Sequence, residues 1–154
     1  MKRLSRWSAH LINDMGSSML ETALVLPMLF LLLIGAVDFG RAFYLSMEVA
    51  GAAHAAAEYG IQVPYDTAGM LSAASSDAPN VPNLSVGSRS YGCECSDGTG
   101  YSANCATAPT CTNTTLVYRV NVTVSATYTP WFPWPGIPSN LSMSNSASMR
   151  SGGS

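Results

Sequence analysis

The residues best suited to chemistry in this 154-residue chain are four cysteines within one short segment: Cys93, Cys95, Cys105 and Cys111. Cysteines at close spacing either form disulfides in an oxidising compartment or hold a zinc ion. Structural zinc sites usually carry C-x2–4-C pairs on both sides, whereas the spacing here is C-x-C-x9-C-x5-C. The pattern favours two disulfides over a metal site, and it leaves all three pairings open.

A second chemical feature is one carboxylate inside an apolar run. Residues 16–37 read GSSMLETALVLPMLFLLLIGAV, and Glu21 is their only charged residue. A carboxylate at a bilayer centre costs roughly 2.5–3.5 kcal/mol, so a segment that keeps one usually has a use for it. Gly16 lies five residues earlier and closes a short leader with three basic residues. Such a leader favours a cytoplasmic N-terminus.

The sequence offers no catalytic set. Its two histidines, His10 and His54, lie in the leader and in the first helical segment, so no histidine accompanies the cysteines as a base. Charged residues make up only 10% of the chain, and no basic cluster follows the leader. Nucleic-acid binding therefore lacks electrostatic support. We expect neither an enzyme nor a cofactor or metal site.

A long helix must carry the apolar run. Residues 22–37 have no charge, and with the weakly polar positions before them they reach about the lower limit for a membrane span. The helical pattern continues to Tyr59, and Gly60 and Pro64 then end it. A helix over residues 18–59 is roughly 60 Å long, about twice a bilayer core. Its second half must therefore leave the membrane and pack on something else.

An apolar stripe follows the outer half of this helix. Phe39, Phe43, Met47 and Ala50 recur at spacings of four, four and three, which is typical of one helix face. We expect Phe39 to lie at the membrane border or face neighbouring subunits. We expect Met47 and Ala50 to pack on a strand of the outer domain.

The strongest strand pattern covers residues 116–128, where apolar and polar side chains alternate cleanly. Within residues 141–149, mostly apolar residues alternate with serines, and this pattern predicts a return strand. The proline-rich turn between them carries Trp131, Phe132 and Trp134. These three aromatic residues are a candidate interface, with packing under the turn as the equal alternative.

The segments before these strands look less regular. Residues 61–90 are rich in turn formers and favour a short helix at 67–74, and residues 91–115 are expected to be a cysteine loop. The predicted fold class is α+β: a long N-terminal transmembrane, pilin-like helix followed by a small antiparallel β domain with a disulfide-bonded loop. The expected divisions are a leader (1–16), the helix (17–60), the β domain (61–150) and a flexible tail (151–154).

The stretch ETALVLPMLFLLLIGAVDFGRAFYLSMEVAGAAHAAAEYG, preceded by the short leader, resembles the TadE-like family, pilin-like proteins of tight-adherence (Tad/Flp) systems. The resemblance covers roughly residues 16–60 and, more weakly, the late proline loop and final strand. It implies that a prepilin peptidase cuts after Gly16 and leaves Ser17 as the new N-terminus. It also implies that the carboxylate of Glu21 pairs with the new amine in a bundle of helices and offsets the cost of burying both charges.

The function that this resemblance implies is that of a minor pilin or pseudopilin of a Tad-type (type IVc) pilus or secretion system, aiding assembly and surface adhesion. Its partners would be prepilin peptidase, other pilin subunits, Tad inner-membrane assembly proteins and the lipid bilayer. The chain would cross the inner membrane once, with its C-terminal domain in the periplasm, and would enter an extracellular pilus. The alternative is an uncleaved, membrane-anchored periplasmic binding domain. A signal peptide cut near Gly35–Ala36 is the other rival.

Overall fold

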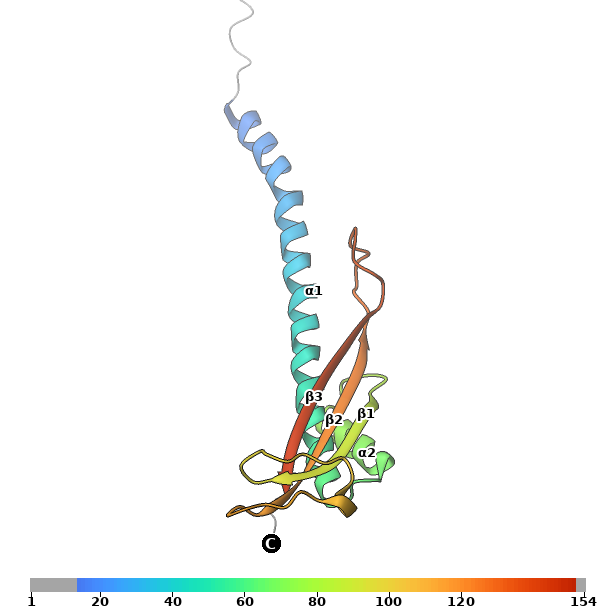
Figure 1. The fold of residues 1–154 in the computed structure, drawn as a ribbon. Coiled ribbons are helices and arrows are strands. Elements are labelled where there is room, and N and C mark those ends of the chain that lie inside the picture. The colour runs from blue at the N-terminus through green and yellow to red at the C-terminus, as the bar shows by residue number, and fades with distance from the viewer. Residues whose placement is uncertain (1–13, 152–154) are drawn as a thin grey trace, which may run out of the picture. The chain divides into compact units, whose positions relative to one another are not determined.

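The computed structural model describes residues 14–151 and divides the chain into two units, Met1–Gly40 and Arg41–Ser154 (Figure 1). Its elements in chain order are α1 (Asp14–Gln62), α2 (Thr67–Asp77), β1 (Ser85–Cys95), a 3-10 turn η1 (Cys105–Thr107), β2 (Leu116–Tyr128) and β3 (Leu141–Ser151). The predicted fold class is confirmed, with a long apolar helix, a small antiparallel sheet and a disulfide. Most of the expected leader and tail, residues 1–13 and 152–154, lies outside the described residues.

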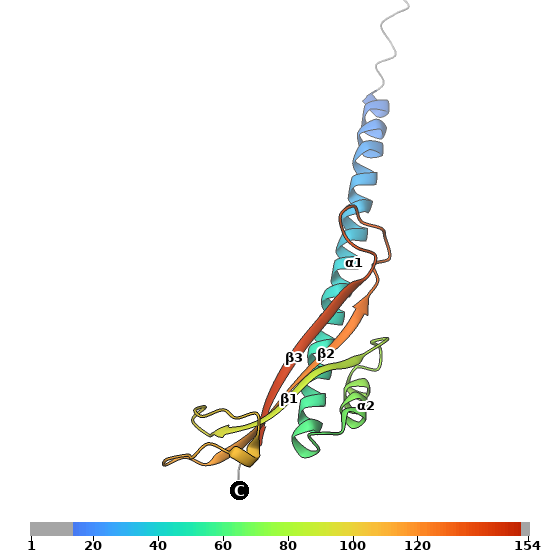
Figure 2. The same ribbon diagram turned by 45° about the vertical axis from the view of Figure 1, so that its right-hand side comes forward.

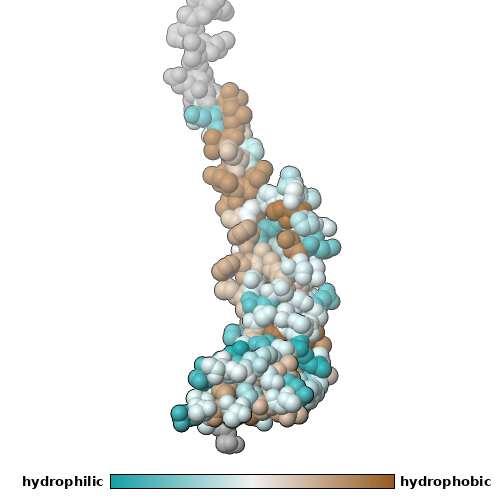
Figure 3. All heavy atoms as spheres, in the orientation of Figure 1, coloured by the Kyte–Doolittle hydropathy of each residue, from teal (hydrophilic) through white to brown (hydrophobic). Residues whose placement is uncertain are grey.

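Helix α1 begins four residues earlier than expected, at Asp14, and runs through Pro27 to Gln62. We call residues 14–40 its inner part, which belongs to the first unit, and residues 41–62 its outer part, which belongs to the second. No side chain from Ser18 to Val37 is buried. Figure 3 shows the inner part as mostly hydrophobic surface, whereas polar colours dominate the second unit.

The second unit is built around β2, the middle strand of a three-stranded sheet with the order β1-β2-β3 (Figure 2). Both neighbours pair with β2 antiparallel. The prediction for residues 116–128 is confirmed to the residue, and the return strand is slightly longer than predicted. The alternation of apolar and polar residues predicted these strands correctly because one face of β2 is buried, whereas the other carries hydroxyl and amide groups.

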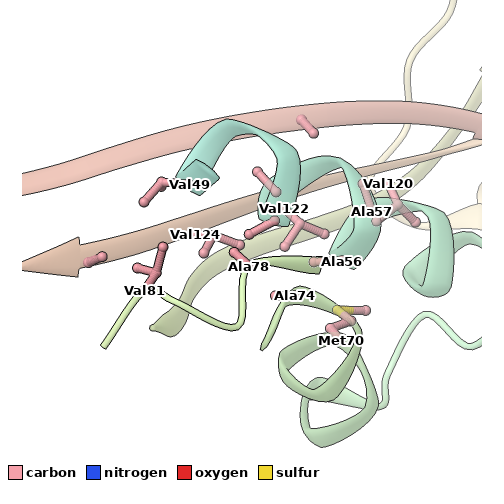
Figure 4. Packing of buried hydrophobic residues seen from close by; sticks show 14 residues of the cluster. Val49, Ala56, Ala57, Met70, Ala74, Ala78, Val81, Val120, Val122 and Val124 are labelled. Atoms are coloured by element: carbon pink, nitrogen blue, oxygen red, sulfur yellow. The ribbon is translucent and has the colours of Figure 1, made fainter. Parts of the chain in front are cut away.

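The core lies between that buried face and the helices (Figure 4). Val120, Val122 and Val124 of β2 are all at most 1% exposed. They meet two sets of side chains, from the outer part of α1 and from α2: Val49, Ala52, Ala53, Ala56 and Ala57, and Met70 and Ala74. Most of the side chains that α1 contributes to this core are alanines, so α1 and the sheet approach each other closely.

The expected packing of Met47 is wrong, because its side chain is 52% exposed. Phe43 is also exposed, and Ala50 is only half-buried. The buried face of α1 instead follows Val49 and the alanines that come after it. The stripe with Met47 and the face with the alanines both have helical periodicity, so residue spacing could not show which one is buried. The alanine face is buried because larger side chains do not fit between a helix and a closely packed sheet.

The expected cysteine loop is wrong at its start, because strand β1 covers Ser85–Cys95 and carries Cys93 and Cys95. Its sequence, SVGSRSYGCEC, contains two glycines and does not alternate. Its register against β2 shifts between Val86 and Arg89, so a period of two could not reveal it. Helix α2 was expected over 67–74, and it extends to Asp77.

Candidate functional site

The expected processing site lies at the start of α1. Gly16, Ser17 and Glu21 all belong to its first turns, so the backbone at the expected cut is helical. The side chain of Glu21 is exposed, and so is its neighbour Leu20, at 67%. The carboxylate therefore projects from the helix surface beside the exposed Ser18 and Thr22, just before the long apolar stretch.

The cysteines form one disulfide and one thiol pair. Cys95 and Cys111 are bonded, with their Cα atoms 5.6 Å apart, which joins the end of β1 to the segment before β2. Cys93 and Cys105 are reduced in this structure, where the Cys93 thiol donates to the carbonyl of Ser102 at 3.7 Å and lies close enough to Cys105 to affect its pKa. Burial, together with the neighbouring Cys93 thiol, raises the pKa of Cys105 to about 11. The structure thus selects one pairing and leaves the other two cysteines adjacent.

A buried ion cluster was missed by the sequence analysis. Glu94 of β1 is 1% exposed, and its Oε1 lies 3.0 Å from Nη2 of Arg119 and 2.7 Å from Nε of Arg150. Arg119 and Arg150 are directly paired across β2 and β3. Two like charges in that position repel, and the carboxylate between them offsets this. The sequence did hold a clue, since these arginines are the only charged residues after Asp97.

The candidate interface aromatics lie on the loop between β2 and β3, residues 129–140. Trp131 is 65% exposed and Phe132 46%. The rings of Phe132 and Trp134 meet edge to face with centroids 6.5 Å apart. The guanidinium carbon of Arg41, at the start of the outer part of α1, lies 3.9 Å from the Trp131 ring centroid. The loop is therefore fixed to the helix while it keeps two aromatic rings exposed.

An open groove of about 300 Å³ lies close by in the second unit. Its walls are the start of the outer part of α1, the residues Asn80 and Pro82, and the end of β2. Tyr44 and Glu48 are neighbours on the helix wall, and the Glu48 carboxylate raises the pKa of Tyr44. The groove mixes one cation, one carboxylate and apolar side chains, so its lining does not select a single ligand class.

Helix α1 is long and apolar enough to cross a membrane. The stretch Ser18–Gln62 includes an 18-residue window with a mean hydropathy of 2.3, and none of that window is buried. Signal sequences near an N-terminus share these properties, as do some core helices, although core helices are mostly buried. The exposed apolar surface therefore suggests membrane anchoring.

Residues 16–58 match the family described as TadE-like protein. Neither the curated proteins nor the solved structures include a match to the chain. The matched segment contains Gly16, Ser17 and Glu21, and it ends before α2, the sheet and the cysteines. It suggests a pilus-associated protein of a Tad system. The resemblance predicted from the sequence is thereby confirmed: over residues 16–58 the chain carries the TadE-like segment.

Proposed function

We propose that this chain is a minor pilin or pseudopilin of a Tad-type (type IVc) pilus or secretion system, and that it aids pilus assembly and surface adhesion. The observation that carries the proposal is the family match over residues 16–58, which spans the expected cut, the carboxylate and most of α1. The role is structural. The partners are prepilin peptidase, other pilin subunits and the inner-membrane assembly proteins of the Tad system.

The surface of the outer part of α1 supports this proposal. Phe43, Tyr44 and Met47 are 62%, 55% and 52% exposed. Large apolar side chains gathered on one helix face usually mark a contact with another protein or with lipid. The helix of a neighbouring subunit would cover this face in an assembled filament. Met47, which was expected to pack on the sheet, then belongs to an assembly surface together with Phe39 and Phe43.

Glu21 has a specific task in this mechanism. A cut after Gly16 creates an amine at Ser17, and that cation enters an apolar bundle when subunits assemble. Burying an isolated charge is costly, whereas a paired charge loses less. The carboxylate of Glu21 on a neighbouring helix would pair with this amine and fix how far one helix slides along the next.

Intact-mass or N-terminal analysis of the protein from its native host tests the cut. We expect the mature chain to begin at Ser17. Gly16→Glu should keep the leader attached, because a glycine at the cut lets the peptidase approach the backbone closely. A chain that still begins at Met1, in a host whose other prepilins are cut, would contradict the proposal. Cutting near Gly35–Ala36 would instead identify a signal peptide.

The assembly role of Glu21 is tested separately. In Glu21→Ala, cutting should largely persist, while recovery of the protein in filaments or assembled complexes should fall. Glu58→Ala is the matched control, since Glu58 is an exposed carboxylate on the same helix, within the outer part. The control should assemble normally. Equal recovery of both variants would show that the carboxylate has no assembly role.

An uncleaved, membrane-anchored periplasmic binding domain is the second candidate. It is favoured by the start of α1 at Asp14, which makes the backbone helical across the expected cut. The exposed Trp131 and Phe132 would then form the contact patch. The same N-terminal analysis separates the two candidates, because only the binding domain retains residues 1–16.

A further inference from the structure

The loop between β2 and β3 contacts Arg41, the first residue of the second unit. The ring of Trp131 lies 3.9 Å from the Arg41 guanidinium, and both residues belong to the second unit. Arg41 follows Val37, the last residue of the uncharged run, by four positions. Four residues span at most about 14 Å even when fully extended. If the run crosses a membrane, the loop must therefore lie near the membrane surface.

The composition of this loop suits that surface. Residues 129–140 read TPWFPWPGIPSN, and no charged residue occurs anywhere between Arg119 and Arg150. Trp131, Phe132 and Ile137 are 65%, 46% and 49% exposed. Tryptophan is enriched at membrane–water interfaces, where its apolar ring and polar N–H both find a suitable environment. The loop can therefore enter the interface without burying a charge.

The backbone of the loop is also suited to a region poor in water. Four of its twelve residues are prolines, which have no N–H to satisfy. The N–H of Ile137 donates to the carbonyl of Trp134 at 3.1 Å. Gly136 has φ +83° at the third position of this turn, as a type II turn with proline in the second position requires. The four prolines and this turn therefore reduce the number of backbone donors that insertion would desolvate.

We propose that the β2–β3 loop inserts into the headgroup region of a phospholipid bilayer, beside the point where α1 leaves it. Trp131 then lies at the interface, where the Arg41 guanidinium stacked on its ring holds the loop to the helix. The loop thus holds the outer domain against the bilayer as a second contact besides the helix.

This inference goes beyond the pilin proposal, because it requires only that residues 22–37 span a bilayer. The test uses the full chain in vesicles of phosphatidylethanolamine and phosphatidylglycerol that contain phosphatidylcholine brominated at defined acyl positions. The variant Trp7→Phe/Trp134→Phe leaves Trp131 as the only tryptophan. Bromine quenches tryptophan fluorescence at short range, so the acyl position that quenches most reports the depth of the ring.

Two control variants give reference values for strong and weak quenching. Each lacks all three native tryptophans and carries one new tryptophan. Phe30→Trp places the probe within the apolar segment, where the side chain is 52% exposed. Tyr101→Trp places it at a 48% exposed site next to Ser102, which pairs with Cys93. Cys93 pairs with the start of β2, whereas the loop follows its end. A strand of 13 residues separates the two sites by roughly 40 Å.

We expect shallow bromines to quench Trp131 several-fold more than the Tyr101→Trp probe, and deep bromines to quench the Phe30→Trp probe most. Quenching of Trp131 no stronger than that of the Tyr101→Trp probe overturns the proposal. If Trp131 is then also shielded from aqueous iodide, a protein such as a second copy of the chain covers the loop. If the Phe30→Trp probe is not quenched, the segment does not span the bilayer and the proposal falls with it.

Discussion

The inner and outer parts of α1 belong to one continuous helix, yet they handle apolar surface in opposite ways. In the inner part, Leu26, Phe30 and Leu32 are between 49% and 67% exposed. In the outer part, Ala52 and Ala56 are completely buried. The large side chains have no cover from their own unit and need lipid or another subunit. The small ones are covered by the sheet.

This difference teaches that a closely packed sheet covers mainly small side chains, since within the outer part the alanines are buried and Phe43 and Met47 stay exposed. Gly60 shows how little space is left. A Cβ atom there would lie 2.9 Å from Cε of Met70 and 3.1 Å from Cγ1 of Val120. At such contacts even a methyl group forces its neighbours to move. Helix α1 therefore carries large apolar side chains along its inner part and mainly small ones on the outer face that packs on the sheet.

The largest expected effect comes from a charge on the buried alanine face. Ala56→Asp should unfold the second unit, because burying an unpaired carboxylate costs on the order of 4 kcal/mol or more, a large part of the stability of a small domain. Hydrogen exchange read by mass spectrometry on the full chain should show loss of protection in β2. Protection in the inner part of α1 should persist.

Met47→Asp is the matched control on the exposed face of the same helix part. Because the side chain at position 47 is 52% exposed, the introduced carboxylate stays in water, and β2 should remain protected from hydrogen exchange. If Met47→Asp unfolds the second unit as fully as Ala56→Asp does, the two faces are not distinct and the comparison fails.

The sequence predicted the elements whose pattern is set by one buried face. Residues 116–128 alternate because every second side chain meets the helices, and the apolar run of α1 is long enough to identify by itself. Strand β1 was missed because its glycines and register shift remove the alternation. The cluster around Glu94 was missed because its partners lie on two other strands, and sequence spacing does not report pairing between strands.

The disulfide should have the next largest effect, again only in the second unit. Removing it with Cys95→Ser/Cys111→Ser should cost about 3 kcal/mol, as expected for a loop of this length. Thermal unfolding of the full chain, followed by near-ultraviolet circular dichroism, measures the loss. Helicity of the inner part of α1 should not change. An unchanged unfolding temperature would mean that other contacts already hold the loop.

Cys93 and Cys105 provide a smaller and chemically different test. Because their thiols are neighbours, we expect them to form a second disulfide in an oxidising compartment, so that protein from the native envelope shows no alkylated thiol. Four labelled thiols, or bound zinc, would contradict both disulfides.

In protein isolated with this pair reduced, alkylation of Cys105 should be slow. The thiolate is the reactive form, and a pKa of about 11 against an ordinary 9.0 lowers its population about 100-fold at neutral pH. The rate should therefore keep rising with pH beyond pH 9. Unfolding in denaturant is the control, since it should restore ordinary reactivity.

The smallest expected effect concerns the start of α2. Asp66 accepts hydrogen bonds from the Gly69 N–H at 2.9 Å and the Tyr59 hydroxyl at 2.7 Å, and these lower its pKa below 3.8. A lowered pKa stabilises the folded state above pH 3.8, and this contribution is lost as the pH falls through the folded-state value. Asp66→Ala should reduce the unfolding temperature slightly at neutral pH.

Asp66→Asn separates the cap from the charge. Asparagine caps helices about as well as aspartate but does not titrate in this range. The variant should keep most of the stability at neutral pH and lose the contribution of this residue to acid sensitivity. An acid-unfolding profile identical to that of the unmodified chain would show that Asp66 does not titrate differently in the folded state.

The ion cluster at Glu94 has a consequence for how the chain is synthesised. Glu94 lies near the middle of the second unit, whereas Arg150 is the penultimate residue of β3. During synthesis, the carboxylate must therefore wait until β2 and nearly all of β3 are made before its second guanidinium arrives. Burial of Glu94 with both partners then requires all three strands of the sheet to be in place. Chains that stop a few residues short would retain most of the core residues and lack the contact that closes the last strand over the first.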